Sequence, residues 1–282
     1  MSMRSDTTKP VGSSEAPDRK RMSTVRKRAH KLPGPGVHRR TKRRVVNIEP
    51  MRYLFLLLPL LLRAGPLTAQ LSLFAGSSFE HEVTERWGYE FQVEHRQLLP
   101  TGRENRLLLQ VAANRLITPH LNVTPGVRLT PDYGLGETVL RLFTDLNAAV
   151  PLGDTPLALE GRLRTQYERV WTEDGAHPEV ALRPRIGLVY APGEHTDIVA
   201  EYEIRYRFDD RDEIVEHRHT LALQQAISTR IAVDFFVRLD REVDQPEPTT
   251  SPFVGIYLIY VLPDERRRDW RYRSPFGRSL LW

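Results

Sequence analysis

The chain has 282 residues, no cysteine and a formal net charge of +5. The lack of cysteine excludes disulfides, thiolate metal ligands and cysteine nucleophiles. The net charge averages two unlike parts, because residues 1–50 carry 14 Lys/Arg against 4 Asp/Glu and residues 51–282 carry 27 arginines against 32 acids.

Residues 1–50 are rich in Ser, Pro, Gly and basic residues and have almost nothing to bury, which predicts a disordered segment. Basic runs such as 39–44 could bind nucleic acid by neutralising phosphates. The alternative is a stretch upstream of a mis-chosen start codon. The export signal that follows favours this alternative, so we expect no nucleic-acid partner.

A signal peptide is predicted for residues 51–69. Residues 53–62 form an unbroken apolar run of ten, flanked by Arg52 and Arg63. A helix needs about 20 apolar residues to span a bilayer, and a run of this length suits a signal peptide instead. Leu67-Thr68-Ala69 then offers small residues for cleavage, with Gln70 first in the mature chain. Residues 70–85 are either a periplasmic lead-in or an extra strand.

From residue 86 to 262 apolar and polar residues alternate with a period of two, which predicts β-strands. In residues 197–208, for example, Tyr202 and Ile204 fall on one face and Glu203 and Arg205 on the other. Ten strands are predicted, at 86–97, 105–116, 120–130, 138–150, 157–171, 179–190, 197–208, 214–225, 230–241 and 252–261.

The lengths of these strands favour an all-β, antiparallel transmembrane barrel. They run about 10–15 residues, whereas soluble strands cluster near 5–6 and tilted membrane strands need about 9–11. Aromatic residues at strand ends on the apolar face predict girdles at the two water–lipid interfaces. These are Trp87, Trp171, Tyr190, Phe208 and Tyr260. A soluble periplasmic lipocalin-like binding barrel, with its apolar face inward, is the alternative.

The links between the predicted strands alternate in length. Placing the longer links outside puts both ends of a ten-stranded barrel in the periplasm. Counting 71–79 as a strand would put the first end outside. Residues 263–282 are a C-terminal tail or a further strand, so twelve strands is the alternative count. The location expected is the outer membrane of a Gram-negative-type bacterium.

Three stretches resemble a family of bacterial outer-membrane barrel proteins known only as a domain of unknown function. They are Trp87 with Glu94-x-Arg96, the segment from Arg183 to Tyr190, and Gly255-Ile256-Tyr257-Leu258-Ile259-Tyr260. The resemblance covers residues 74–262. It implies a barrel in the cell envelope and carries no activity.

The polar face of the strands is densely and evenly charged, which predicts an ion-paired network inside the barrel. Its main members are Arg96, Arg141, Arg162, Arg164, Arg183, Arg185, Glu201, Glu203, Arg205, Arg207, Asp234 and Arg238. Eight strands enclose just enough room for side chains, and aqueous porins need about 16. We therefore expect a salt-bridged lumen in a structural or small-solute envelope protein; the alternative is a narrow, charge-tuned pore.

An outer-membrane lipid-acting hydrolase is the enzyme alternative, and it depends on His217 and His219. A histidine on the outer wall could serve as the base for a serine nucleophile. No serine on a neighbouring predicted strand faces them, and a third metal ligand is not evident. We therefore expect no catalytic site, metal or cofactor. The partners expected are outer-membrane lipid and, during biogenesis, the barrel-assembly machinery.

Overall fold

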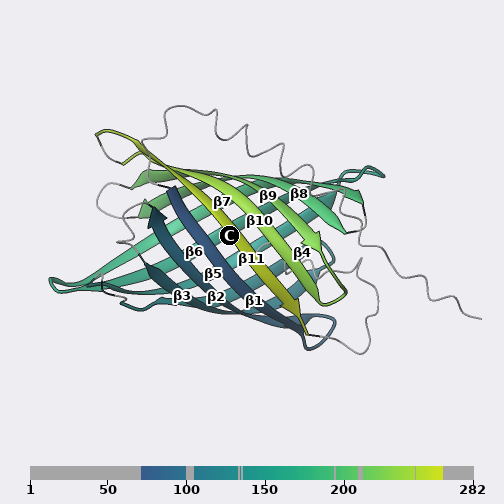
Figure 1. Ribbon diagram of the computed structural model, residues 1–282, viewed down its shortest axis with the longest axis horizontal. Coiled ribbons are helices and arrows are strands. Elements are labelled where there is room, and N and C mark those ends of the chain that lie inside the picture. The colour runs from purple at the N-terminus through teal and green to yellow at the C-terminus, as the bar shows by residue number, and fades with distance from the viewer. Residues whose placement is uncertain are drawn as a thin grey trace, which may run out of the picture. The chain divides into compact units, whose positions relative to one another are not determined.

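The computed structural model describes residues 71–262 except 100–104, 133, 135, 194, 209–211 and 245, and the described residues form eleven strands (Figure 1). These are β1 (Leu71–Glu82), β2 (Trp87–Leu99), β3 (Arg106–Thr118), β4 (Leu121–Thr130), β5 (Thr138–Pro151), β6 (Leu157–Thr172), β7 (Gly175–Gly193), β8 (Thr196–Phe208), β9 (Glu213–Ala226), β10 (Ile231–Glu242) and β11 (Thr249–Val261). Within that part of the chain, no helix is long and apolar enough to cross a membrane. The predicted segments 1–50, 51–69 and 263–282 lie outside the described residues.

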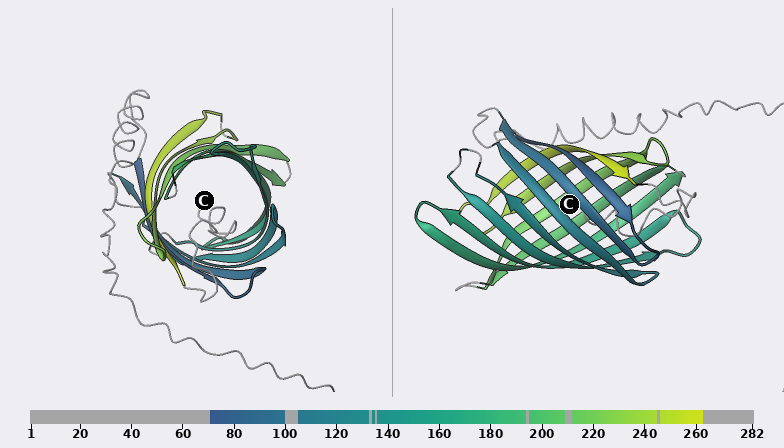
Figure 2. Two further views of the ribbon diagram at one scale, coloured as in Figure 1. Left: turned by 90° about the vertical axis from the view of Figure 1, so that its right-hand side faces the viewer. Right: turned by 90° about the horizontal axis from the view of Figure 1, so that it is seen from below.

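The strands close into one barrel, in which each strand pairs with its neighbours in the chain and β1 pairs with β11 (Figure 2). Ten pairs are antiparallel. β1 and β11 run parallel, with Ser72 opposite Phe253 and Glu80 opposite Val261. This parallel seam follows from the odd strand number, because alternating directions bring the first and last strands round pointing the same way. The predicted all-β barrel is confirmed.

The predicted strand count was one too low. The ten predicted strands agree with β2–β11 to within a few residues, and β1 is the extra strand. The outward face of β1 carries small residues at its centre, Ala75 and Ser77, between Leu73 and Phe79. These side chains give only a weak period-two pattern, so pairing with β2 and β11 decides the structure of this segment.

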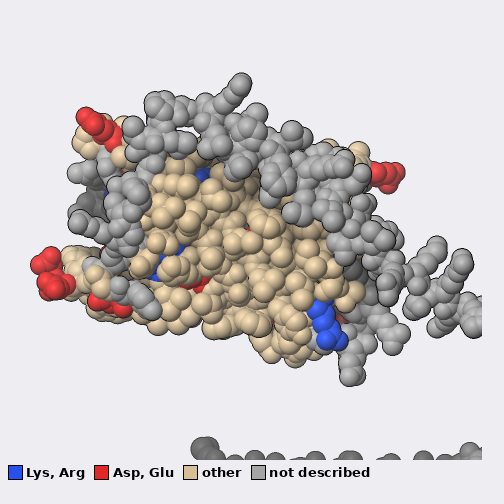
Figure 3. All heavy atoms as spheres, in the orientation of Figure 1, with Lys and Arg blue, Asp and Glu red and all other residues tan. Residues whose placement is uncertain are grey.

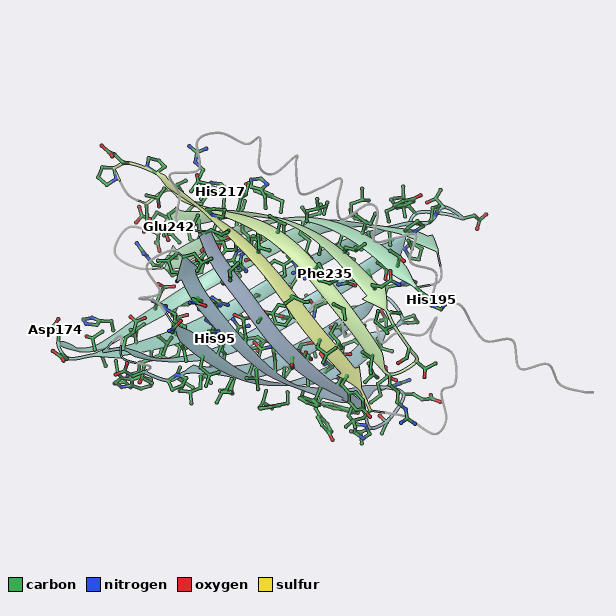
Figure 4. All side chains as sticks on the ribbon, in the orientation of Figure 1. His95, Asp174, His195, His217, Phe235 and Glu242 are labelled. Atoms are coloured by element: carbon green, nitrogen blue, oxygen red, sulfur yellow. The ribbon has the colours of Figure 1, made fainter. Side chains whose placement is uncertain are left out.

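The links between strands fall at two opposite ends of the barrel, which Figure 4 marks by Asp174 and by His195. We call them the Asp174 end and the His195 end. The links after β2, β4, β6, β8 and β10 lie at the Asp174 end, and the others lie at the His195 end. β1 starts at the Asp174 end, whereas β11 finishes at the His195 end. The expectation that both would lie at one end is therefore wrong, because β1 adds one more crossing.

The period-two pattern produces a wall with opposite chemistry on its two faces. On β10, Val233 is opposite the exposed Leu258 of β11, whereas Asp234 is opposite the buried Tyr257. On the face that Figure 3 shows, the visible surface over the strands is accordingly almost uncharged, with charge mainly toward the ends. Among the described residues, buried polar and charged side chains outnumber buried apolar ones. The arrangement is the reverse of a soluble protein, whose interior is mainly apolar.

Three inward glycines leave room for aromatic rings on the strand beside them. Gly255 is opposite Phe236, Gly126 is opposite Phe143, and Gly76 is opposite Tyr257. At each glycine an added Cβ would overlap that ring. The rings therefore pack against the wall itself, which leaves the centre of the barrel to longer polar side chains.

Candidate functional site

The interior of the barrel is the candidate site, because the alternation of β2–β10 turns most of the charged residues inward. The structure places all twelve expected members of the network on this face. Arg96 lies on β2, Arg141 on β5, Arg162 and Arg164 on β6, Arg183 and Arg185 on β7, Glu201, Glu203, Arg205 and Arg207 on β8, and Asp234 and Arg238 on β10. Each arginine of this set forms an ion pair with a carboxylate.

Glu203 is the centre of one group of ion pairs. It is 3% exposed and accepts hydrogen bonds from Arg162 and Arg183. Arg218 of β9 donates to the same carboxylate, with Nη1 3.3 Å from Oε1. Three guanidinium groups thus share one carboxylate, a pattern that joins β6, β7, β8 and β9 across the interior.

A second set of pairs lies within strands and between neighbouring strands. Asp240 receives Arg218 at 2.8 Å and Arg238 at 3.1 Å. Further pairs include Arg96–Glu94, Arg141–Glu168, Arg185–Glu201, Arg205–Glu179, Arg207–Glu213 and Arg207–Asp244. Since an unpaired charge in a confined, poorly hydrated space is costly, this pairing is what makes a charged interior tolerable.

A layer of fully buried side chains from β2 to β6 lies inside the barrel between the two ends, and we call it the septum. We define it as Gln92, Gln110, Thr124, Asp145 and Arg164, each at most 2% exposed. Arg164 contacts Asp145 through two hydrogen bonds, of 2.6 and 2.7 Å. Gln110 donates to Gln92 at 3.1 Å. Nearly every polar group here has a partner, as buried polar groups require.

Two hollows lie on either side of the septum, and they share no lining residue. The hollow toward the Asp174 end has a volume of about 430 Å³, and the hollow toward the His195 end about 20 Å³. Along β4, Thr124 lies between Asn122 of the small hollow and Arg128 of the large one. Of these two hollows, the one toward the Asp174 end is large enough for a solute.

The large hollow is lined by one arginine from each of the nine consecutive strands β2–β10. These are Arg96, Arg106, Arg128, Arg141, Arg164, Arg183, Arg205, Arg218 and Arg238, which we call the arginine ring. Among the described carboxylates, Glu94 and Glu242 line the same hollow. Most arginines of the ring also pair with a carboxylate, such as Glu168, Glu203 or Asp240. Arginines therefore dominate the lining of the large hollow, and acids lie close behind them.

Sequence reasoning missed the aromatic residues that complete the large hollow at the seam. Phe74 of β1 and Phe253 and Tyr257 of β11 line it beside the arginine ring. Tyr257 donates a hydrogen bond past β1 to Glu94 of β2. The alternation of β11 could have placed Phe253 and Tyr257 inward, but Phe74 could be placed only once β1 was recognised as a strand.

His217 and His219 lie on the outer side of β9, where they contact Tyr202 of β8 (Figure 4). The hydroxyl of Tyr202 is 2.6 Å from Nδ1 of His217. An open hollow there is lined by Tyr202, the two histidines and Arg241. This set contains no hydroxyl or thiol nucleophile of the serine or cysteine type. In the described part of the chain, no three His, Asp or Glu gather as a metal site would require.

The five predicted girdle residues lie near the ends of their strands. Trp87, Trp171, Tyr190 and Phe208 are among the exposed large side chains, and Tyr260 is half-buried. Trp87, Tyr190 and Tyr260 are toward the His195 end, whereas Trp171 and Phe208 are toward the Asp174 end. Each end of the outer wall therefore carries aromatic rings.

Several solved structures are similar to the chain. The KdgM porin in complex with disordered oligogalacturonate is 15% identical, with a TM-score of 0.40 over 64% of this chain and 87% of that chain. The NanC porin is 11% identical, with a TM-score of 0.41 over 61% and 87%. An anion-selective porin from Comamonas acidovorans is 15% identical, with a TM-score of 0.32 over 63% and 54%.

No curated protein matches the chain. A family model described as "Protein of unknown function (DUF2490)" does match, over residues 72–247. This range takes in β1 to β10 and more than half of the chain, and the predicted family resemblance is confirmed. The chain therefore belongs to the DUF2490 family.

Proposed function

We propose that the protein is an outer-membrane β-barrel, a structural or small-solute envelope protein whose lumen is closed to solutes larger than water and small ions. Its apolar outer wall, with aromatic rings at both ends, suits contact with lipid. Its charged interior suits a lumen that its own side chains fill. The partners proposed are outer-membrane lipid and the barrel-assembly machinery, with no role for nucleic acid.

The observation that carries the closed lumen is the septum. Its members are at most 2% exposed, and the hollows on either side of it share no lining residue. Each arginine beside it fills much of the available space, and its planar guanidinium group pairs well with carboxylates. Opening a path would leave charged partners unpaired, so the network resists it.

The two alternatives have less support. A soluble lipocalin-like barrel needs an apolar interior, whereas here the interior is charged and the apolar side chains are outside. A lipid-acting hydrolase needs a nucleophile beside His217 or His219, and the described residues lining that hollow provide none. A polar cluster at the water–lipid interface explains why the two histidines lie on the outer wall, and it requires no catalytic role.

Liposome swelling tests the closed lumen. We expect vesicles containing the purified barrel to swell no faster in arabinose than empty vesicles, because the septum separates the two hollows. Rapid sugar entry through the wild-type protein would make it a pore and end the proposal.

A paired variant in the septum provides the matched comparison. Asp145→Ala with Arg164→Ala removes two fully buried side chains, and we expect it to raise ion conductance in planar bilayers. Glu137→Ala with Arg106→Ala removes an equally charged pair at the rim, where both side chains are partly exposed. If the rim variant conducts as much as the septum variant, the septum is not the barrier.

A further inference from the structure

The arginine ring brings more like charges together than a lumen would need if its side chains only had to fill the space. Along the β2–β3, β4–β5 and β6–β7 pairs, ring arginines are direct cross-strand partners: Arg96 with Arg106, Arg128 with Arg141 and Arg164 with Arg183. Like charges directly opposite each other destabilise a sheet. A lumen that only had to be filled would gain from placing arginine opposite carboxylate, as Arg205 is placed opposite Glu216.

Arg128 differs from the other described arginines of the ring, because each of them forms a salt bridge with a carboxylate and Arg128 pairs with an amide. Its Nε donates to Gln110 at 2.9 Å, and its strongest carboxylate neighbour, Glu94, acts on it from beyond salt-bridge distance. It is 7% exposed and lines the large hollow, and its cross-strand partner is the guanidinium-bearing Arg141. A buried cation of this kind is costly unless something anionic joins it.

At the seam between β1 and β11, aromatic side chains stack on two further arginines of the arginine ring. This stacking orients the guanidinium groups and does not neutralise their charge. The guanidinium carbon of Arg96 is 4.3 Å from the ring centre of Phe74. Arg238 is 4.5 Å from Phe253 and 4.8 Å from Phe74. Stacking on ring faces fixes the direction of a guanidinium while leaving its charge in place. Both arginines also keep a carboxylate partner, Glu94 for Arg96 and Asp240 for Arg238.

We propose that the arginine ring is a binding site for a compact solute that carries two or more carboxylate or phosphate groups. A hollow of about 430 Å³ falls within the size range of small-ligand pockets, ~300–1,000 Å³. Planar guanidinium groups form paired, charge-assisted hydrogen bonds with the oxygens of either group. The septum separates this hollow from the one toward the His195 end, so the site is blind-ended and the solute leaves by the end it entered.

Titration calorimetry of the detergent-solubilised protein tests the site. The probes are citrate for the carboxylate class and inorganic pyrophosphate for the phosphate class, with uncharged glucose as the comparison. We expect at least one anion to bind with an affinity that falls as salt rises, because screening weakens such contacts. If neither anion binds better than glucose at low salt, the proposal is overturned.

Three variants assign any binding to the ring. Arg128→Gln should weaken binding about tenfold or more, which is the scale of a lost hydrogen bond to a charged group. Arg128→Lys keeps the charge and should lose less. Arg115→Gln removes an arginine that stacks on Trp87 on the outer wall, and it should bind as the wild type does. Equal loss in the Arg115 and Arg128 variants, at matched folding in a heat-modifiability gel, would contradict the site.

The inference rests on the proposed barrel, but its test is independent of the closed lumen. Binding is measured in detergent without transport, whereas the lumen is tested by sugar entry into vesicles. A barrel that binds pyrophosphate and also swells in arabinose would keep the site and lose the closed lumen. A barrel that does neither would keep the closed lumen and lose the site.

Discussion

Phe235→Arg is expected to block stable assembly of the barrel in lipid, whereas Asp234→Asn, one residue away, is expected to be tolerated far better. Phe235 belongs to the outward face of β10, opposite Ile256 of β11. It lies between the two ends of the barrel and away from both (Figure 4). An arginine on the lipid face costs roughly 2–4 kcal/mol near the bilayer midplane. Asp234 points inward, so its neutralisation only changes the balance of interior charge.

The measurement is heat-modifiable gel mobility after folding into phospholipid vesicles, with Phe235→Leu as the control for side-chain size. We expect the folded band to persist for Phe235→Leu and Asp234→Asn and to be lost or strongly reduced for Phe235→Arg. The reverse order, with Asp234→Asn blocking assembly and Phe235→Arg folding normally, would mean that the barrel's apolar face is not in lipid.

The second large effect is expected at the Asp145–Arg164 pair of the septum. Both side chains are fully buried and joined by two hydrogen bonds, and Arg164 also stacks on Phe143 at 4.2 Å. Removing one partner of a buried pair leaves an uncompensated charge and costs about 3–5 kcal/mol. We therefore expect Asp145→Ala to lower the free energy of unfolding on that scale.

A double variant separates charge from packing at this position. Asp145→Leu with Arg164→Met removes both charges and keeps an apolar chain beside Phe143, so it should recover most of the stability that Asp145→Ala loses. Glu137→Ala, at the exposed rim, should cost no more than about 1 kcal/mol. Denaturant unfolding in detergent micelles gives all three values. A rim loss as large as the Asp145 loss would show that burial does not govern these pairs.

Much of the fold could be predicted because a membrane wall imposes a strict period of two. Every predicted strand from 86 onward corresponds to an observed one, and the face of each charged residue followed from its place in the alternation. The sequence leaves residues 70–85 open between a lead-in and an extra strand, because the outward face of β1 is small at the centre, at Ala75 and Ser77; the extra strand is what the structure shows. Its place depends on pairing with β11, a contact between segments nearly two hundred residues apart that no local pattern encodes.

The candidate site could be predicted in composition but not in arrangement. The alternation identifies Arg128 and Arg141 as inward, yet only the strand register shows that they are direct neighbours. The sharing of Glu203 by three arginines likewise depends on side chains from four strands meeting at one level. Long arginine side chains can reach several acids, so sequence spacing does not choose among partners.

If the barrel lies in a membrane, β10 presents one face to lipid and the other to a charged interior. The chain has no cysteine, so single cysteines at positions 232–240 can carry a nitroxide in reconstituted vesicles. Electron paramagnetic resonance then measures collisions with lipid-soluble oxygen at each position. The account predicts high oxygen collision at 233, 235, 237 and 239 and low collision at 232, 234, 236, 238 and 240. A profile without alternation, or one with the even positions more accessible to oxygen, would contradict it.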